Sequence, residues 1–327
     1  MQQVNWGIIG CGNVTEVKSG PAFAKVPRSM LAAVMRRNTE KARDYAQRHG
    51  VSRWYDDAQL LIDDPVVNAI YIATPPDVHE DYAIRALRAG KPVYLEKPMA
   101  LDAAAAKRIA AVAQETGTPL CIAHYRRQQP LFLAIKNLLD AGAIGRVQLA
   151  RLELFQPHES SLIARTDENW RLDPGRSGGG LFHDLAPHQL DLMSYFFGTY
   201  KSACGLSCNT GGWYEADDTT SGQIVFENGV LFEGTWCFAA HRTTDSCTIT
   251  GTEGELQFSI FGRAPLVINT ARGREEQHFD PLLHVQQPMI EAVVNYLLGE
   301  GDNPCPAAAG VESMELIDRF TGAAYLR

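Results

Sequence analysis

The sequence predicts an α/β protein that begins with a Rossmann domain, a doubly wound parallel sheet, and continues into a second domain of strands closed by helices. Two observations lead to this prediction. Up to about residue 125, short apolar strands alternate with amphipathic helices, which is typical of a parallel sheet. Segments 147–156, 221–239 and 247–261 instead alternate apolar and polar residues, with Glu-Asn-Gly and Glu-Gly turns. The 327 residues are enough for two domains.

Composition and charge limit the classes of function. No apolar run approaches the roughly 18 residues that a membrane span needs, and MQQVNWGIIG lacks the cationic start of a secretory signal. The net charge of −8, with acids and bases interspersed, argues against nucleic-acid binding. The seven cysteines include no C-x-x-C pair. We therefore expect a cytoplasmic protein with free thiols, without a metal site, that binds neither membrane nor nucleic acid.

The first strand, VNWGIIG, runs into the turn GCGNVT, after which the pattern becomes helical. Gly10 permits a tight turn, and Gly12 lets the backbone approach a pyrophosphate. Asn13 and Val14 begin the helix, whose unpaired N–H groups favour an anion. Thr15 stands where a third glycine could stand. The arrangement predicts a dinucleotide site, and the alternative is a tight glycine turn without a ligand.

The end of the second strand, SMLAAVMRR, distinguishes between the two nicotinamide cofactors. An NAD site usually has an acid there that bonds the ribose 2′-OH, whereas this chain has Arg36 and Arg37. Guanidinium groups pair with a 2′-phosphate, and a carboxylate would repel it. We therefore predict NADP as the cofactor. The alternative is NAD, with both arginines as solvated loop charges.

The alternation continues with predicted helices at 41–50, 54–63 and 79–90 and predicted strands at 66–76, 93–95 and 118–125. In a doubly wound sheet the ligand lies at the carboxyl ends of the strands, where Thr74, Lys97 and His124 are found. Pro98 restricts the residue before it to extended geometry, which would hold the Lys97 ammonium at the edge of the crevice. By position alone, a surface lysine that caps the strand is an equal alternative.

Residues 170–191, WRLDPGRSGGGLFHDLAPHQLD, place a glycine-rich loop before a helical pattern. Asp184, His188 and Asp191 are spaced i, i+4 and i+7, so they share one helix face. The apolar residues around them leave little of the helix for water, which predicts a buried functional face. The alternative is a polar face in solvent. Pro187 is expected to kink or restart the helix.

These motifs resemble the glucose–fructose oxidoreductase, inositol dehydrogenase and rhizopine-catabolism (Gfo/Idh/MocA) family over nearly the whole chain. The motifs are GCGNVT, ATPP, EKP, NWR before SGGG, and D-x-x-x-H-x-x-D. The resemblance implies that Lys97 polarises the substrate oxygen, His188 exchanges the proton, and Asp184 holds the substrate hydroxyl or the histidine. It also implies a cofactor site formed by Gly10, Gly12, Asn13, Val14, Arg36, Arg37, Thr74, Pro75, His79, Glu96, Lys97, Trp170 and Arg171.

The resemblance further implies that the second domain is α+β, with a large open, mostly antiparallel sheet. The predicted domains are a dinucleotide-binding Rossmann domain at residues 1–123 and a substrate-binding and oligomerisation domain at residues 124–327. The open sheet face implies a homodimer or homotetramer. Tyr125, Arg126 and His183 depart from the family pattern and are candidate substrate contacts. The alternatives are a polar hinge for the first two and simple packing for His183.

The implied reaction is reversible hydride transfer between the nicotinamide and a sugar, polyol or related cyclic hydroxy or keto compound. A related dehydrogenase acts on trans-dihydrodiols and has a tyrosine in the position of His188, which argues against that substrate here. Two alternatives are a dinucleotide-binding ligand sensor or regulator without turnover and a glycosidase that uses tightly held NAD. The retained Lys97, Asp184 and His188 argue against the sensor. The arginines at positions 36 and 37 argue against the glycosidase.

Overall fold

The computed structural model describes residues 2–17, 19–160, 162 and 169–322, and it omits the side chains of residues 13 and 17. The chain packs as two compact units, Met1–Gln129 with Leu282–Met314 and Pro130–Pro281 with Glu315–Arg327. This packing differs from the single boundary predicted after residue 123, because the segment 282–314 returns to the first unit. There, the Asn303 side chain donates a 2.8 Å hydrogen bond to the Leu120 carbonyl.

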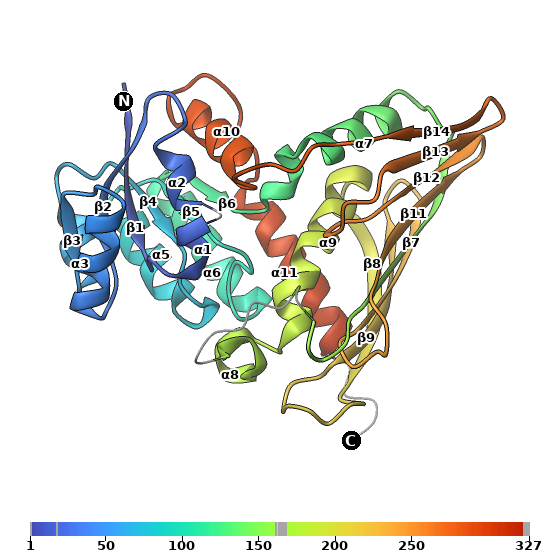
Figure 1. The fold of residues 1–327 in the computed structure, drawn as a ribbon, viewed down its shortest axis with the longest axis horizontal. Helices are drawn as coiled ribbons and strands as arrows, with labels where there is room; N and C mark the ends of the chain where they lie inside the picture. The colour runs from blue at the N-terminus through green and yellow to red at the C-terminus, as the bar shows by residue number, and fades with distance from the viewer. Residues whose placement is uncertain (1, 18, 161, 163–168, 323–327) are drawn as a thin grey trace. The chain divides into compact units, whose positions relative to one another are not determined.

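The first unit is built on a six-stranded parallel sheet in the order β3-β2-β1-β4-β5-β6 (Figure 1). Its strands are β1 Val4–Ile9, β2 Ser29–Met35, β3 Arg53–Tyr55, β4 Ala69–Ile72, β5 Val93–Leu95 and β6 Leu120–Ile122. Every residue of β4 and β5 is buried, as expected for parallel strands covered on both faces. The strand order reverses at β1, which lies between β2 and β4. The predicted doubly wound sheet is therefore confirmed, with its switch point at the carboxyl ends of β1 and β4.

Local sequence explains where several helices of this unit begin and end. The helices are α1 Asn13–Val17, α2 Gly20–Phe23, α3 Thr39–Arg48, α4 Ala58–Asp63, α5 His79–Arg88, α6 Ala103–Thr116 and α10 Gln287–Leu297, with 3₁₀ turns η1 Pro76–Val78 and η2 Tyr125–Gln128. The side chains of Asn38, Asp57 and Asp102 accept backbone N–H bonds at the starts of α3, α4 and α6. Gly117 ends α6 in the left-handed conformation.

The helix predicted over residues 54–63 is wrong in its first part. Trp54 and Tyr55 pair in parallel with Val34 and Met35 as part of β3, and α4 begins only at Ala58. A three-residue edge strand is defined by its pairing with a neighbouring strand. The local pattern of the sequence carries little sign of that pairing.

The second unit contains an eight-stranded sheet in the order β14-β13-β12-β11-β7-β10-β9-β8. Its strands are β7 Val147–Phe155, β8 Tyr200–Cys208, β9 Thr219–Phe226, β10 Leu231–Cys237, β11 Thr244–Gly251, β12 Gly254–Phe258, β13 Leu266–Thr270 and β14 Gly273–Gln277. The pair β7–β10 is parallel and the other pairs are antiparallel. Buried residues alternate with exposed or half-buried ones along β9. The expected mostly antiparallel α+β domain is thus confirmed.

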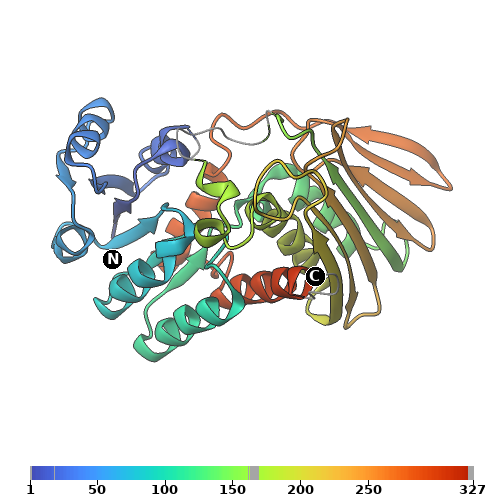
Figure 2. The same cartoon turned by 90° about the horizontal axis from the view of Figure 1, so that it is seen from below.

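Helices cover one face of this sheet, as two views show for α7 and α9 (Figures 1 and 2). The helical elements of the second unit are α7 Pro130–Asp140, η3 Trp170–Leu172, α8 Pro174–Ser177, α9 Leu181–Phe197 and α11 Ala307–Thr321. Of α11, only the part from residue 315 belongs to this unit. The helix α9 continues through Pro187, so the helix does not restart there. Between helix and sheet, Trp236 packs against Phe182 and Phe232 at ring-centroid distances of 5.0 and 6.4 Å.

Two further findings concern membrane-spanning helices and the cysteines. Within the described ranges, no helix is long and apolar enough to cross a membrane. The cysteines are free thiols, and Cys11, Cys121, Cys247 and Cys305 are buried.

Candidate active site

The glycine turn after β1 lies against the turn after β4. Gly10 has a φ of 96°, and a Cβ added to it would lie 2.6 Å from Thr74 Cγ2 and 2.8 Å from the Thr74 backbone nitrogen. Packing therefore requires a glycine at position 10. A Cβ on Gly12 would meet only the Gly10 carbonyl oxygen, at 3.9 Å. Packing among the described residues therefore does not explain a glycine at position 12.

Arg36 lies beside this turn, whereas Arg37 does not contact it through any described hydrogen bond. Met35, at the end of β2, accepts the backbone N–H groups of Gly10 and Cys11 at 2.9 and 3.2 Å. The Arg36 Nη1 atom donates to the Cys11 carbonyl at 3.3 Å, and the side chain is half-buried. Arg37 is exposed. Of the two predicted phosphate ligands, Arg36 is thus the one placed at the glycine turn.

The buried side chain of His79 contacts the two loops that follow β4 and β5. Its ring is fully buried, with Nδ1 3.0 Å from the Pro98 carbonyl and Nε2 2.9 Å from the Thr74 carbonyl. Burial lowers the pKa of His79, so a single ring nitrogen carries a proton at neutral pH and one of the two contacts is a hydrogen bond at a time. Pro75, in the same turn, is half-buried. His79 would thus contribute to the predicted cofactor site indirectly, by holding the ATPP and EKP loops in position.

Glu96 is a buried carboxylate held from three directions. Its Oε1 accepts hydrogen bonds from the Tyr71 hydroxyl and from Gln286 Nε2, both at 2.6 Å, and its Oε2 accepts the Lys97 backbone N–H at 3.1 Å. The Tyr94 hydroxyl donates to Gln286 Oε1 at 3.3 Å. Burial raises the pKa of Tyr71 well above its ordinary value, which keeps this hydroxyl a donor. These bonds fix the backbone from which Lys97 extends.

The ends of β5 and β6 carry the remaining candidates of the first unit. Lys97 is half-buried, and its peptide bond to Pro98 is cis. Tyr125 is 5% exposed and lies in η2, with the Arg126 guanidinium carbon 5.6 Å from its ring centroid. Arg126 Nη1 also donates to Gln129 Oε1 at 3.4 Å. Tyr125 is therefore buried, and Arg126, which is half-buried, is the more accessible of the two predicted substrate contacts.

In the second unit, the NWR segment and α9 meet through a buried ion pair. Arg171 Nε donates to Asp184 Oδ2 at 2.9 Å, with side-chain exposures of 9% and 14%. The Arg171 guanidinium carbon also lies 4.4 Å from the ring centroid of Trp170. Asp184 is thereby fixed in position and kept close to a positive charge.

The polar face of α9 is buried. His188 is 4% exposed, with its ring at the edge of Phe261 at a centroid distance of 5.9 Å, and Asp191 is 2% exposed. The solvated helix face considered as an alternative is therefore wrong. The neighbouring His183 ring occupies the place that a Cβ on residue 179 would take, 2.2 Å from His183 Cε1, so that Gly179 makes room for it. Burial lowers the pKa of His183 to about 4, which keeps this imidazole neutral.

Comparison with known proteins identifies this arrangement. Residues 4–124 match the family model described as an oxidoreductase family with an NAD-binding Rossmann fold. Residues 132–257 match that of the GFO/IDH/MocA C-terminal domain. The chain belongs to the Gfo/Idh/MocA family of oxidoreductases.

Other members of the Gfo/Idh/MocA family resemble the chain over most of its length. Oxidoreductase P35 of Formosa agariphila is 45% identical, covering 98% of this chain and 99% of the relative. The trans-1,2-dihydrobenzene-1,2-diol dehydrogenase of Mus musculus is 30% identical, covering 82% of this chain and 79% of the relative. A solved structure of levoglucosan dehydrogenase in complex with NADH has the same fold, with a TM-score of 0.87, 23% identity and coverage of 98% and 96%.

Two features of this Gfo/Idh/MocA chain escaped the sequence prediction. Tyr71 and Gln286 bond the EKP glutamate, yet they lie 25 and 190 residues away from it in sequence. A pocket of about 160 Å³ in the second unit includes Trp213 and Tyr214 in its lining. The segment NTGGWY, which contains both residues, is polar and rich in glycine, which is typical of a surface loop. Two adjacent aromatic residues in a surface loop indicate a binding site rather than a core.

Proposed function

We propose that this oxidoreductase transfers a hydride reversibly between a nicotinamide cofactor and the carbinol carbon of a sugar, a polyol or a related cyclic hydroxy or keto compound. The observation that carries the proposal is the buried polar face of α9, where Asp184 is held by Arg171 and lies one helical turn from His188. A buried acid and imidazole on one face are costly for stability and have a use in proton transfer.

The first unit fits a dinucleotide. Gly12 has no packing reason to be glycine, and Thr74 Oγ1 is buried without a hydrogen-bond partner among the described residues. Gly10, Gly12 and Val14 would hold the pyrophosphate, with Asn13, whose side chain lies outside the described part of the chain. Thr74, Pro75 and Glu96 would line the nicotinamide side. When bound, the nicotinamide supplies or accepts the hydride.

Each catalytic residue then has a defined task. In the direction of reduction, negative charge grows on the carbonyl oxygen, and the Lys97 ammonium stabilises it electrostatically. His188 delivers the proton to that oxygen, as an imidazole can near neutral pH. Asp184 accepts a hydrogen bond from the substrate hydroxyl or orients His188. The hydrogen bond from the Lys97 backbone to Glu96 supports the position of the ammonium group.

We favour NADP over NAD because Arg36 is placed at the glycine turn, where its guanidinium group is available to pair with a 2′-phosphate. The levoglucosan dehydrogenase of similar fold was solved with NADH, so NAD is the alternative. That enzyme's name also supports a sugar-like substrate. A carbohydrate fits the donors and acceptors of Asp184, His188 and Lys97 better than an apolar ring.

A turnover screen tests the proposed function. The protein is incubated with NADP or NAD and a panel of sugars and polyols, and formation of the reduced cofactor is followed by absorbance. Net reduction supports the dehydrogenase. Sugar release without net cofactor change would indicate the NAD-dependent glycosidase, and cofactor and sugar binding without either reaction would indicate a sensor.

The proposal includes a homodimer or homotetramer formed through the second unit's sheet. Leu206 on β8 and Val225 on β9 are 56% and 36% exposed, and apolar side chains on an open sheet face are typical of an interface. Light scattering should give a mass at least twice 36.0 kDa. A mass near 36.0 kDa at micromolar concentration would contradict this part of the proposal.

A further inference from the structure

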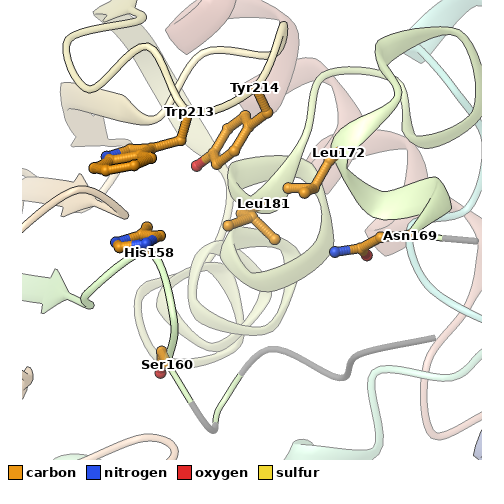
Figure 3. Close-up of a pocket in the computed structure, with 7 residues that line it drawn as sticks. All are labelled: His158, Ser160, Asn169, Leu172, Leu181, Trp213 and Tyr214. Atoms are coloured by element: carbon orange, nitrogen blue, oxygen red, sulfur yellow. The ribbon is translucent and has the colours of Figure 1, made fainter. Parts of the chain in front are cut away.

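The pocket of the second unit lies at the beginning of α9, next to the candidate catalytic face (Figure 3). Its lining includes Leu181, the first residue of α9, and Leu172, which follows Arg171. Leu181 is three residues before Asp184 and therefore on the same side of the helix. Asp184 and His188 are not among the lining residues. The pocket is thus a neighbour of the catalytic face and distinct from it.

An exposed aromatic pair forms one wall of the pocket. The Trp213 ring stacks on His158 with centroids 4.1 Å apart and planes within 2°, although Trp213 is 61% exposed. Leu172 and Leu181 lie on the other side of the space (Figure 3). An indole that is exposed to solvent while an imidazole stacks on one of its faces presents a flat apolar surface to a ligand.

The loop that carries Trp213 is held rigidly before any ligand binds. Asp218, which is 1% exposed, accepts the backbone N–H groups of Thr210 and Gly211 at 3.0 and 2.7 Å. Asn209 Nδ2 donates to the Tyr214 carbonyl at 2.5 Å. A preorganised loop loses little conformational entropy on binding, which favours affinity.

The hydroxyl of the lining residue Tyr214 is buried without a hydrogen-bond partner among the described residues. Figure 3 shows the hydroxyl directed into the space between Leu181 and the Trp213–His158 pair. Burial raises the pKa of Tyr214, so its hydroxyl remains a donor. A buried donor without a partner lowers stability, and a ligand with hydroxyl groups would supply the missing partner.

These features define the ligand by its chemistry. Part of the wall is apolar, formed by Leu172, Leu181 and the Trp213 ring, and the Tyr214 hydroxyl needs a hydrogen-bond partner. Among the described lining residues there is no lysine or arginine to bind an anion. A six-membered ring with apolar C–H faces and a rim of hydroxyls meets these conditions. The volume of about 160 Å³ is sufficient, because a cavity of about 150 Å³ can hold a six-membered ring such as benzene.

We infer that this pocket binds a second sugar ring, so that the substrate is a disaccharide or a larger glycoside rather than a single sugar. Leu181 and His188 are seven residues apart, or about 10 Å along the helix axis, which is longer than one ring. A substrate that reaches both His188 and the pocket therefore extends over two rings. The inference rests on the proposed function for the identity of the reacting ring.

The test compares the binding of disaccharides with that of their component monosaccharides. Cellobiose, lactose, maltose, mannobiose and xylobiose are titrated calorimetrically into the protein with NADP present, alongside glucose, galactose, mannose and xylose. At least one disaccharide should bind about tenfold more tightly than its components, a difference of about 1.4 kcal/mol. Trp213→Ala should remove this advantage. Tyr214→Phe should reduce it about fivefold, the effect of one hydrogen bond of about 1 kcal/mol.

Two controls keep the result interpretable. Trp54→Ala removes an indole that is 38% exposed on β3 and should leave the disaccharide advantage intact. Trp213→Phe should restore part of it. The inference is overturned if no disaccharide binds more tightly than its components, or if Trp213→Ala preserves the advantage. Turnover of monosaccharides with no such advantage keeps the proposed function and rejects the pocket. Disaccharide binding that depends on Trp213 without any turnover keeps the pocket and rejects the proposed function.

Discussion

Arg171 holds Asp184 in place: its Nε atom donates a 2.9 Å hydrogen bond to Asp184 Oδ2 within a largely buried ion pair. The arginine comes from η3 and the acid from the first turns of α9, so the pair also fastens the glycine-rich loop between them. Sequence motifs assigned Arg171 to the cofactor. In the second unit its described ion pair is with the acid expected to act in catalysis.

Replacing Arg171 by Met should destabilise the protein by about 3 kcal/mol, because it breaks a largely buried ion pair. The double variant Arg171→Met with Asp184→Leu should recover part of the loss. Urea denaturation measures both free energies of unfolding, and Arg242→Met, at an exposed position, is the matched control. A single variant as stable as the wild type would show that the ion pair contributes nothing.

His183 should make stability depend on pH in a defined window. Its pKa is about 4 in the folded chain and 6.5 as the ordinary value. The unfolded chain thus binds a proton that the folded one excludes. The contribution of His183 to the free energy of unfolding is therefore most favourable above pH 6.5. It decreases as the pH falls from 6.5 to about 4 and stays constant below that. The loss amounts to about 3 kcal/mol.

His183→Gln should therefore flatten the dependence of the free energy of unfolding on pH between 6.5 and 4, measured by urea denaturation. His278→Gln is the control, because the side chain of His278 is 75% exposed, and it should leave the slope unchanged. Equal slopes for His183→Gln and the wild type would mean that His183 titrates in the folded protein as it does in the unfolded chain.

Arg36→Asp should reverse the cofactor preference. The wild type is expected to bind NADPH more tightly than NADH, and the substitution should weaken NADPH binding about tenfold or more, the scale of one lost charge-assisted hydrogen bond. Arg37→Asp is the matched control, because Arg37 is exposed and Arg36 contacts the glycine turn. Fluorescence titration gives the affinities. Equal affinity of the wild type for both cofactors would contradict the assignment to NADP.

Much of the fold follows from the sequence, because its strands and helices are marked by local patterns. The strand before Gly10 is apolar except for Asn5, as expected for a strand buried on both faces, and residues 221–239 alternate as a sheet with one covered face requires. Pro75 and Pro98 mark the turns at Thr74 and Lys97. These signals come from residues that are close together in the sequence, so a single sequence is enough to recognise them.

The missing parts depend on contacts between residues distant in sequence. Gln286 reaches Glu96 because α10 returns to the first unit, and no periodicity announces that return. The strand at Trp54 exists only through its pairing with β2. The ion pair of Arg171 with Asp184 bridges a glycine loop whose path the sequence leaves open. Each of these features requires the tertiary structure.

The rate of the hydride-transfer step in Lys97→Met tests the central claim most directly. Methionine keeps a stem of similar length and removes the ammonium, while the hydrogen bond of Glu96 to the backbone of residue 97 can remain. With a substrate from the turnover screen, stopped-flow measurement should show NADPH affinity largely unchanged and hydride transfer slowed about 100-fold or more, the scale of one lost oxyanion donor. Hydride transfer at the wild-type rate would contradict the account, and Lys97 would then be only the end of a strand.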